Sequence, residues 1–182
     1  MSSDLSPSPD ATPSASQPID ADALVARYSD LGVGVVRGSR GDWGLQVACE
    51  QSLAALTRLH SDATVAMCRL VDLTAVDHLG RAGFENARFE VVYQLHSPNL
   101  QQRMRVHVVL GQQAPTIDSV VALWPAAGWL EREVFDLFGI QFRAHPDLRR
   151  ILLEADFEGA PLRKDHPLRI DRALPGEDLH DR

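Results

Sequence analysis

The chain has 182 residues, 45% of them hydrophobic, and a formal net charge of -7 at pH 7. A chain of this length buries one ordinary core and is too short for two large domains with separate cores. The acidic balance excludes a broad basic field that would attract nucleic acid or anionic lipid to the whole chain, so we expect neither as a partner. No apolar run in the sequence approaches the roughly 20 residues that span a bilayer, and we expect no membrane anchor in it.

The sequence offers few residues for holding a cofactor. Cys49 and Cys68 are its two cysteines, too far apart for a Cys-x-x-Cys pair. Iron-sulfur clusters usually take four thiolates, and structural zinc takes four ligands at short paired spacings, so neither site can be built from these cysteines. The seven histidines include no close His-x-x-x-His pair, and no glycine loop matches a nucleotide-binding motif. We therefore expect no cofactor and no metal on this chain.

Residues 1–18 are mostly serine, proline, alanine and aspartate. Such a segment has little apolar surface to bury against the entropy of ordering, so we expect a disordered tail. Residues 1–23 contain aspartates and no basic residue, which excludes a basic secretory leader and an Arg-rich mitochondrial transit peptide. We expect a bacterial cytoplasmic origin.

After this tail, periodic apolar residues predict a helix and a pair of strands. Asp20 can cap the helix and Gly32 can end it. The apolar residues of the helix recur at helical spacing: Leu24, Val25, Tyr28 and Leu31. Two strands over Val33–Val36 and Trp43–Ala48 then flank a Gly-Ser-Arg-Gly turn.

A second helix is predicted over Glu50–His60, with Leu53, Leu56 and Leu59 on one side, and a strand over Thr64–Val71. The clearest strand pattern follows, where apolar residues alternate with mostly polar ones on either side of a Ser-Pro-Asn loop. The alternating residues are Phe89, Val91, Tyr93 and Leu95, then Met104, Val106, Val108 and Leu110. They predict an antiparallel pair with one buried face.

A third helix is predicted to run to about Phe138, because Pro125 suits a first turn and Gly139 a left-handed stop. Its apolar stripe is expected to be Ala126, Leu130, Val134 and Leu137. The order helix, two strands, helix, three strands, helix predicts an α+β fold, a mostly antiparallel sheet packed by helices on one side. We assign this domain to residues 19–139.

The charged residues of the third helix invite a catalytic interpretation. Glu131 and Glu133 are expected to point outward in different directions, because two residues turn a helix by about 200°. That argues against a general acid and base converging on one substrate. Arg132 is expected to pair with Asp136 one turn further on.

Residues 140–182 are charged, punctuated by prolines and poor in apolar residues, so we expect an extended arm that lies across another surface. Its charges alternate, as suits an interface fixed by charge-assisted hydrogen bonds. Its expected apolar anchors are Leu148, Ile151, Leu152, Phe157 and Leu162. We assign partner docking to the following residues of the helix and the arm: Glu131, Arg132, Glu133, Asp136, His145, Asp147, Arg149, Arg150, Arg163, Lys164 and Asp165.

A family resemblance rests on the same region. The Glu131-Arg132-Glu133 run, with Asp136, His145, Arg149 and an Ile-Leu pair at these spacings, resembles the C subunit of bacterial NADH:quinone oxidoreductase, respiratory complex I. The resemblance extends upstream through three further segments and covers about two-thirds of the chain. Those segments are Asp72–Asp77, Phe89–Leu95 and Ser119–Trp124.

The resemblance implies a structural subunit of the peripheral arm of the complex, not catalytic by itself, on the cytoplasmic side of the cell membrane. It implies that NADH, FMN, the iron-sulfur clusters and quinone are bound elsewhere in the complex. The partners implied are the D subunit, which forms the quinone site, and the B subunit, which bears the terminal cluster, and membrane association is indirect. The complex as a whole transfers electrons to quinone and pumps protons.

Two alternatives stay open on the sequence. Equivalent subunits serve membrane-bound hydrogenases and the photosynthetic relative of complex I, which the sequence separates poorly. From another class, a small soluble hydrolase or lyase would use Glu133, Asp136 and His145, provided that these groups meet in a cleft.

Overall fold

The computed structural model describes residues 18–37, 42–85 and 87–167. The expected disordered tail lies outside them except for Pro18, and so do the Gly-Ser-Arg-Gly turn and the last part of the arm. The helices are α1 (Ala21–Arg27), α2 (Ser52–Ser61) and α3 (Ala127–Phe138), with short 3-10 helices η1 (Ser29–Leu31) and η2 (Cys49–Gln51). The strands are β1 (Gly34–Arg37), β2 (Trp43–Val47), β3 (Arg69–Asp77), β4 (Phe89–Ser97), β5 (Gln102–Leu110), β6 (Thr116–Asp118) and β7 (Gln141–Arg143).

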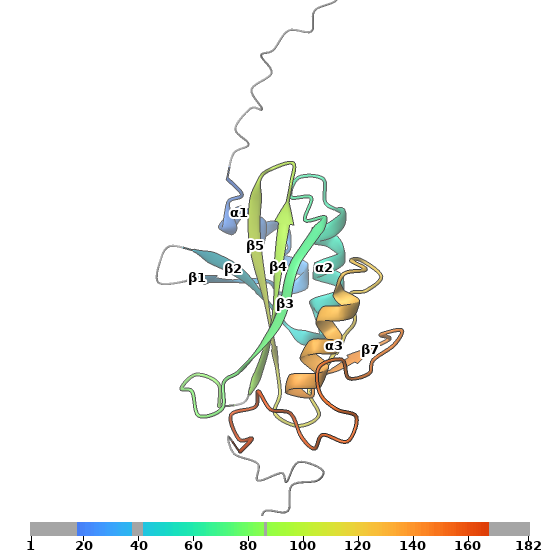
Figure 1. Cartoon of the computed structure of the whole chain (residues 1–182). Helices are drawn as coiled ribbons and strands as arrows, with labels where there is room; N and C mark the ends of the chain where they lie inside the picture. The colour runs from blue at the N-terminus through green and yellow to red at the C-terminus, as the bar shows by residue number, and fades with distance from the viewer. Residues whose placement is uncertain (1–17, 38–41, 86, 168–182) are drawn as a thin grey trace, which may run out of the picture.

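Five strands form one sheet in the order β1-β2-β5-β4-β3. The pairs β1-β2, β5-β4 and β4-β3 are antiparallel, and β2-β5 is parallel. In Figure 1, α2 and α3 lie on one side of the three long strands while β1 and β2 project on the other. The predicted α+β fold with a mostly antiparallel sheet is confirmed. The sequence patterns did not predict β6 and β7, which form a separate parallel pair.

One face of the sheet carries the core. The alternating apolar residues of β4 and β5 are buried, as predicted, and they belong to one cluster with Leu24 of α1, Leu56 of α2 and Val134 of α3. Burial of a side chain of this size contributes about 1.5–3 kcal/mol. The helices are therefore packed against this face of the sheet through apolar contacts. No helix in the described ranges is long and apolar enough to cross a membrane.

The buried side of α2 and the start of β3 were predicted wrongly. The buried side of α2 consists of Ser52, Ala55, Leu56 and Leu59, so Leu53, one position off this stripe, is exposed. The strand expected over Thr64–Val71 begins only at Arg69. Asp62 accounts for the delay, because its side chain and carbonyl accept backbone N–H groups and turn the chain there.

Gly44 allows the parallel pair β2-β5 to form. A Cβ atom at this position would lie 2.9 Å from the Arg105 carbonyl oxygen and 2.8 Å from Nε2 of His107. The neighbouring backbone cannot move aside as a flexible side chain can. The close approach of the two strands therefore requires glycine at this position.

We predict that Gly44→Ala lowers the free energy of unfolding by about 1–3 kcal/mol, because it overpacks the contact between β2 and β5. Urea denaturation of the purified chain measures the change. Gly34→Ala in β1 is the matched control, since a Cβ there meets nothing within 4 Å. Equal stability of the two variants would contradict this account of the β2-β5 pair.

Candidate docking surface

The helix α3 ends as predicted, with Gly139 in the left-handed conformation at φ 69°. Its inward face is not the expected stripe. The buried residues are Ala127, Glu131, Arg132, Val134, Asp136 and Phe138, whereas Ala126 is exposed and Leu130 and Leu137 are half-buried. Three of the buried residues are charged. Each of these three side chains is buried against polar groups, either of the loop before α3 or of the arm.

Glu131 points into the protein, which corrects the expectation that it faces outward. Its carboxylate accepts hydrogen bonds from the backbone N–H of Val120 and the hydroxyl of Ser119, both at 2.7 Å. Burial raises the pKa of this carboxyl, although the two hydrogen bonds oppose the change. Glu131 thus ties the loop before α3 to the helix. Glu133 is exposed, so the two glutamates do point apart.

Asp136 holds the arm. One carboxylate oxygen accepts the backbone N–H groups of Ile151, Leu152 and Leu153 at 3.1, 2.8 and 2.9 Å. The other accepts from Nη1 of Arg150 at 2.8 Å. Burial alone would raise the pKa of Asp136, but these donors outweigh it and the pKa is lowered. The carboxylate is therefore ionised and matched by donors from the arm.

Arg132 grips the same segment from its carbonyl side. Its guanidinium donates to the Arg149 carbonyl at 3.0 Å and to the Arg150 carbonyl at 3.3 Å. It also lies 3.8 Å from the Asp147 carboxylate and over the ring of Trp129. The predicted pairing of Arg132 with Asp136 is wrong, because both side chains bind the arm.

His145 fixes the first bend of the arm against α3. Its Nδ1 accepts the backbone N–H of Asp147 at 3.0 Å, which assigns the proton to Nε2. Nε2 then donates to the Gly128 carbonyl at 3.1 Å. Nearby, the exposed side chains of Asp147 and Arg149 pair with each other at 3.0 Å. His145 is thus engaged in holding the chain together.

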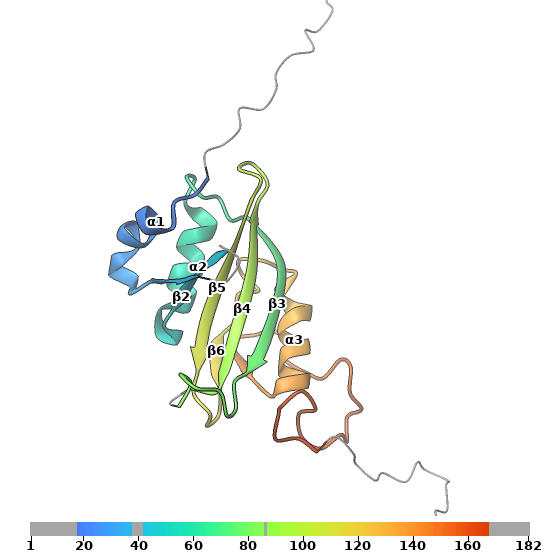
Figure 2. The ribbon, with the colours of Figure 1, turned by 90° about the vertical axis from the view of Figure 1, so that its left-hand side faces the viewer.

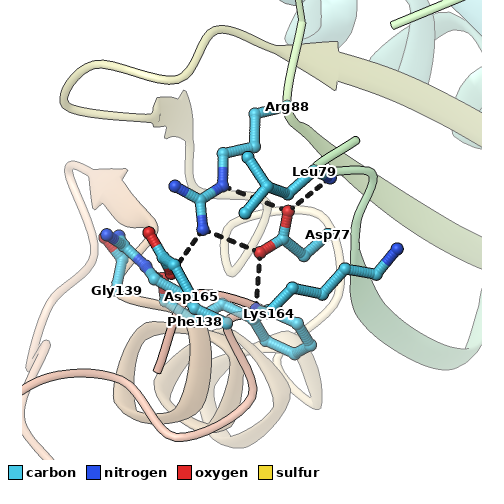
Figure 3. A network of polar contacts seen from close by, with 8 residues as sticks. Asp77, Leu79, Arg88, Phe138, Gly139, Lys164 and Asp165 are labelled. Atoms are coloured by element: carbon cyan, nitrogen blue, oxygen red, sulfur yellow. Dashed lines mark hydrogen bonds and ion pairs between the residues drawn. The ribbon is translucent and has the colours of Figure 1, made fainter. Parts of the chain in front are cut away.

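A second attachment joins the arm to the end of β3, as Figure 3 shows. The buried Arg88 binds Asp77 through Nε and Nη2, at 3.1 and 2.9 Å, and reaches Asp165 at 2.6 Å. The backbone N–H of Lys164 donates to Asp77 at 2.9 Å, while its side chain points away from that carboxylate. Burial would raise the pKa of Asp77, but Arg88 and the backbone donors lower it to about 2.

Arg163 completes the attachment at the end of α3. It donates to the carbonyls of Phe138 and Gly139 at 2.6 and 3.4 Å, and the Leu162 N–H donates to the Leu137 carbonyl at 3.1 Å. A cation at a helix C-terminus also interacts favourably with the helix dipole. We call this set of attachments the clasp; its members are Asp77, Arg88, Arg132, Asp136 and Arg163.

Sequence reasoning gave no role to Asp77 and Arg88. One signal was available for Asp77. It continues the alternation of Leu73 and Ala75, so strand periodicity places it on the inward face, where a carboxylate needs a partner. Arg88 directly precedes the buried strand that begins at Phe89, and periodicity does not distinguish it from an exposed loop residue.

The arrangement does not assemble a catalytic centre from Glu133, Asp136 and His145. Asp136 is enclosed by donors from the arm, His145 is bound to backbone groups, and Glu133 is exposed. The hydrolase alternative required these groups to meet in a cleft, and no such meeting occurs. Within the described ranges, no three His, Cys, Asp or Glu side chains gather so that they could hold a metal ion.

Comparison with known proteins bears on the same region. The family model described as respiratory-chain NADH dehydrogenase, 30 Kd subunit, matches residues 45–172. The NADH-quinone oxidoreductase C subunit of Trichlorobacter lovleyi is 47% identical over 133 residues, which is 73% of this chain and 79% of that protein. The corresponding C subunit of Acidithiobacillus ferrooxidans is 45% identical over 131 residues, 71% of this chain and 65% of that protein.

A solved structure is similar as well. The trypsin-resistant fragment of Nqo5 superimposes with a TM-score of 0.62 at 28% sequence identity, covering 70% of this chain and 98% of the fragment. The family resemblance identified from the sequence is confirmed by these matches.

We predict that Asp136→Ala releases the arm. The change leaves three backbone N–H groups and Arg150 without their acceptor. It should lower the free energy of unfolding by roughly 2–3 kcal/mol. This loss is smaller than the loss expected for a fully buried ion pair, because Arg150 is partly exposed. Trypsin should cut after Arg149 and Arg150 at least tenfold faster than in the native chain. Glu133→Ala, on the exposed side of the same helix, is the control, and equal cleavage rates in the two variants would contradict this role of Asp136.

The lowered pKa of Asp77 predicts how the second attachment depends on pH. A carboxylate whose pKa drops from 3.8 to about 2 on folding stabilises the fold above pH 3.8 and loses this contribution as the pH falls towards 2. The shift corresponds to roughly 2 kcal/mol. In urea denaturation, the native chain should exceed Asp77→Asn in stability by a constant amount from pH 7 to 5, and the difference should narrow below pH 4. A difference that grows on acidification would contradict the assignment.

Proposed function

Because the chain belongs to the family of the 30 kDa subunit of respiratory-chain NADH dehydrogenase, we propose that it is the C subunit of an NADH-quinone oxidoreductase and that its task is docking. In this family the oxidoreductase activity belongs to the complex. The chain contributes by holding neighbouring subunits in place, and it carries no redox group itself. NADH, FMN, iron-sulfur clusters and quinone are bound by the other subunits.

The partners proposed are the D subunit, with the quinone site, and the B subunit, with the terminal cluster. The chain would lie on the cytoplasmic side of the bacterial membrane and associate with the membrane through the complex. The domain and the arm, divided after Gly139, would have separate tasks: the domain orders the arm, and the arm meets the partner.

The proposal is supported by the orientation of the side chains: the charged side chains of the clasp point inward, whereas apolar side chains near them point outward. The clasp binds the backbone of residues 149–153 and of Lys164, and the Leu137 carbonyl accepts the N–H of Leu162. Leu152 and Leu162 of the arm remain 61% and 51% exposed, and Trp129 of α3 remains 66% exposed. Exposed leucine and tryptophan on an ordered backbone are the anchors that interfaces use, because little entropy is lost when they are covered.

This arrangement refines the docking residues assigned from the sequence. Glu131, Arg132, Asp136, His145, Arg150 and Arg163 form contacts within the chain, so their part in docking would be to position the arm. Contact with a partner would fall to the exposed charged residues, of which Asp147, Arg149 and Asp165 also form ion pairs within the chain. The exposed charged residues are Glu133, Asp147, Arg149, Lys164 and Asp165.

We predict that Leu152→Asp together with Leu162→Asp reduces, at least tenfold, the amount of other subunits that co-purify with the tagged chain in mild detergent. A charge at each anchor has to be desolvated in the interface, and two anchors at about 1–2 kcal/mol each account for a tenfold loss or more. Quantitative mass spectrometry measures the ratio of subunits.

Leu53→Asp is the matched control, since Leu53 is an exposed leucine on α2, away from the arm. Circular dichroism should show that all variants are folded. If the double variant retains the complex as fully as the control does, docking does not use the arm. If the native chain co-purifies with no NADH-oxidising assembly, the proposed function itself is wrong.

A further inference from the structure

The outer face of the sheet, opposite the core, carries a row of basic side chains across three strands. Arg69 of β3 lies directly opposite His96 of β4, and His96 lies directly opposite Arg103 of β5. Their neighbours Leu70, Leu95 and Met104 are buried in the core, so alternation turns the row away from it. Figure 2 shows the three strands side by side.

The basic row is not neutralised by ion pairs within the part of the chain that the structure describes, although the register also places Asp72 on this face, opposite Gln94. Elsewhere on the same face, charges are matched: Arg105 pairs with Asp42, and Glu90 lies between the rings of His78 and His107. Neither Arg69 nor Arg103 forms an ion pair with a described carboxylate.

A hollow of about 370 Å³ lies beside this row. Its walls include Trp43 and Val71, the arginines Arg103 and Arg105, and Asp42, which pairs with Arg105. The register shifts between Leu70 and Asp72, so Val71 is the extra residue of a β-bulge, and Leu70 directly before it faces the core. Val71 is consequently directed outward and is 44% exposed. A β-bulge of this kind re-aims a side chain at a cost in pairing.

The two arginines, together with the apolar side chains of Val71 and Trp43 in the wall of the hollow, indicate the chemistry of the ligand. A cationic row favours carboxylates, and the hollow between Val71 and Trp43 has room for an apolar side chain. Anionic lipid and nucleic acid present rows of phosphates. Binding such a row takes a broad basic field, which two arginines in a chain of net charge -7 do not provide, whereas a short acidic segment needs only a few cations.

We propose that this outer face binds an acidic segment of a neighbouring protein subunit, with carboxylates on Arg69 and Arg103 and an apolar side chain in the hollow. The proposal rests on the proposed function, because it takes the neighbour to be another subunit of the same complex. It adds a second contact, on the opposite side of the sheet from α3. The segment neutralises the basic row that the chain itself leaves unmatched.

Zero-length cross-linking in the purified complex tests this. Lys164 is the single lysine of the sequence, so Arg103→Lys places a second reactive amine in the row while keeping the charge. A carbodiimide activates a carboxylate; the amine then displaces the urea and an amide bond forms. Gln113→Lys is the control, since this exposed position follows the opposite end of β5.

The expected result is an amide between the substituted position 103 and an aspartate or glutamate of another subunit, identified by mass spectrometry at least tenfold above the control. Arg69→Gln in the same chain should reduce its yield. If the complex co-purifies intact but no such link exceeds the control, the inference is overturned and the proposed function stands. If no NADH-oxidising assembly co-purifies, both fail.

A lipid partner would be revealed separately. The purified full chain is floated with vesicles of phosphatidylglycerol or of phosphatidylcholine. Equal and negligible binding to both is expected. Binding to phosphatidylglycerol that disappears in Arg69→Gln/Arg103→Gln would assign the row to anionic lipid and overturn the protein-segment proposal.

Discussion

The carboxylate of Asp136 is the contact on which the placement of the arm depends. An isolated buried charge is costly, and here three successive backbone N–H groups and Arg150 compensate for it. The same contact gives residues 151–153 partners that an irregular segment otherwise finds only in water. One acidic side chain on α3 thus fixes the direction in which the arm leaves the helix. Arg132 restricts that direction further from the carbonyl side.

The rest of the clasp extends this principle to the sheet. Asp77 ends β3 on the inward side, and Arg88 links it to the arm through Asp165. Arg163 closes the end of α3 and lies over the Phe89 ring. The arm is therefore positioned by polar groups, although it has little core of its own. Leu152 and Leu162 are left exposed, and under the proposed docking role a shape set in advance reduces the entropy lost on assembly.

Local patterns predicted the local elements well. Strict alternation fixed β4 and β5, and Pro125 and Gly139 bracketed α3, because these features act within a few residues. The side of α3 that faces inward was not predictable in the same way. Sequence periodicity predicts a glutamate such as Glu131 to be exposed. It is buried only because the Val120 N–H and the Ser119 hydroxyl need an acceptor. Arg132 and Asp136 have helical spacing for a pair, yet partners 14 to 18 residues away displaced that pairing. Competition between near and distant partners is decided by the tertiary structure.

Amide hydrogen exchange of the isolated subunit tests the central claim most directly, namely that the arm is ordered by its own domain before any partner binds. Exchange of the N–H groups of Ile151, Leu152 and Leu153 is measured at neutral pH, in the native chain and in Asp136→Ala. We expect these three amides to be protected in the native chain and to lose protection together in the variant. Exchange at the rate of an unstructured peptide in the native chain, with protection appearing only inside the complex, would contradict it.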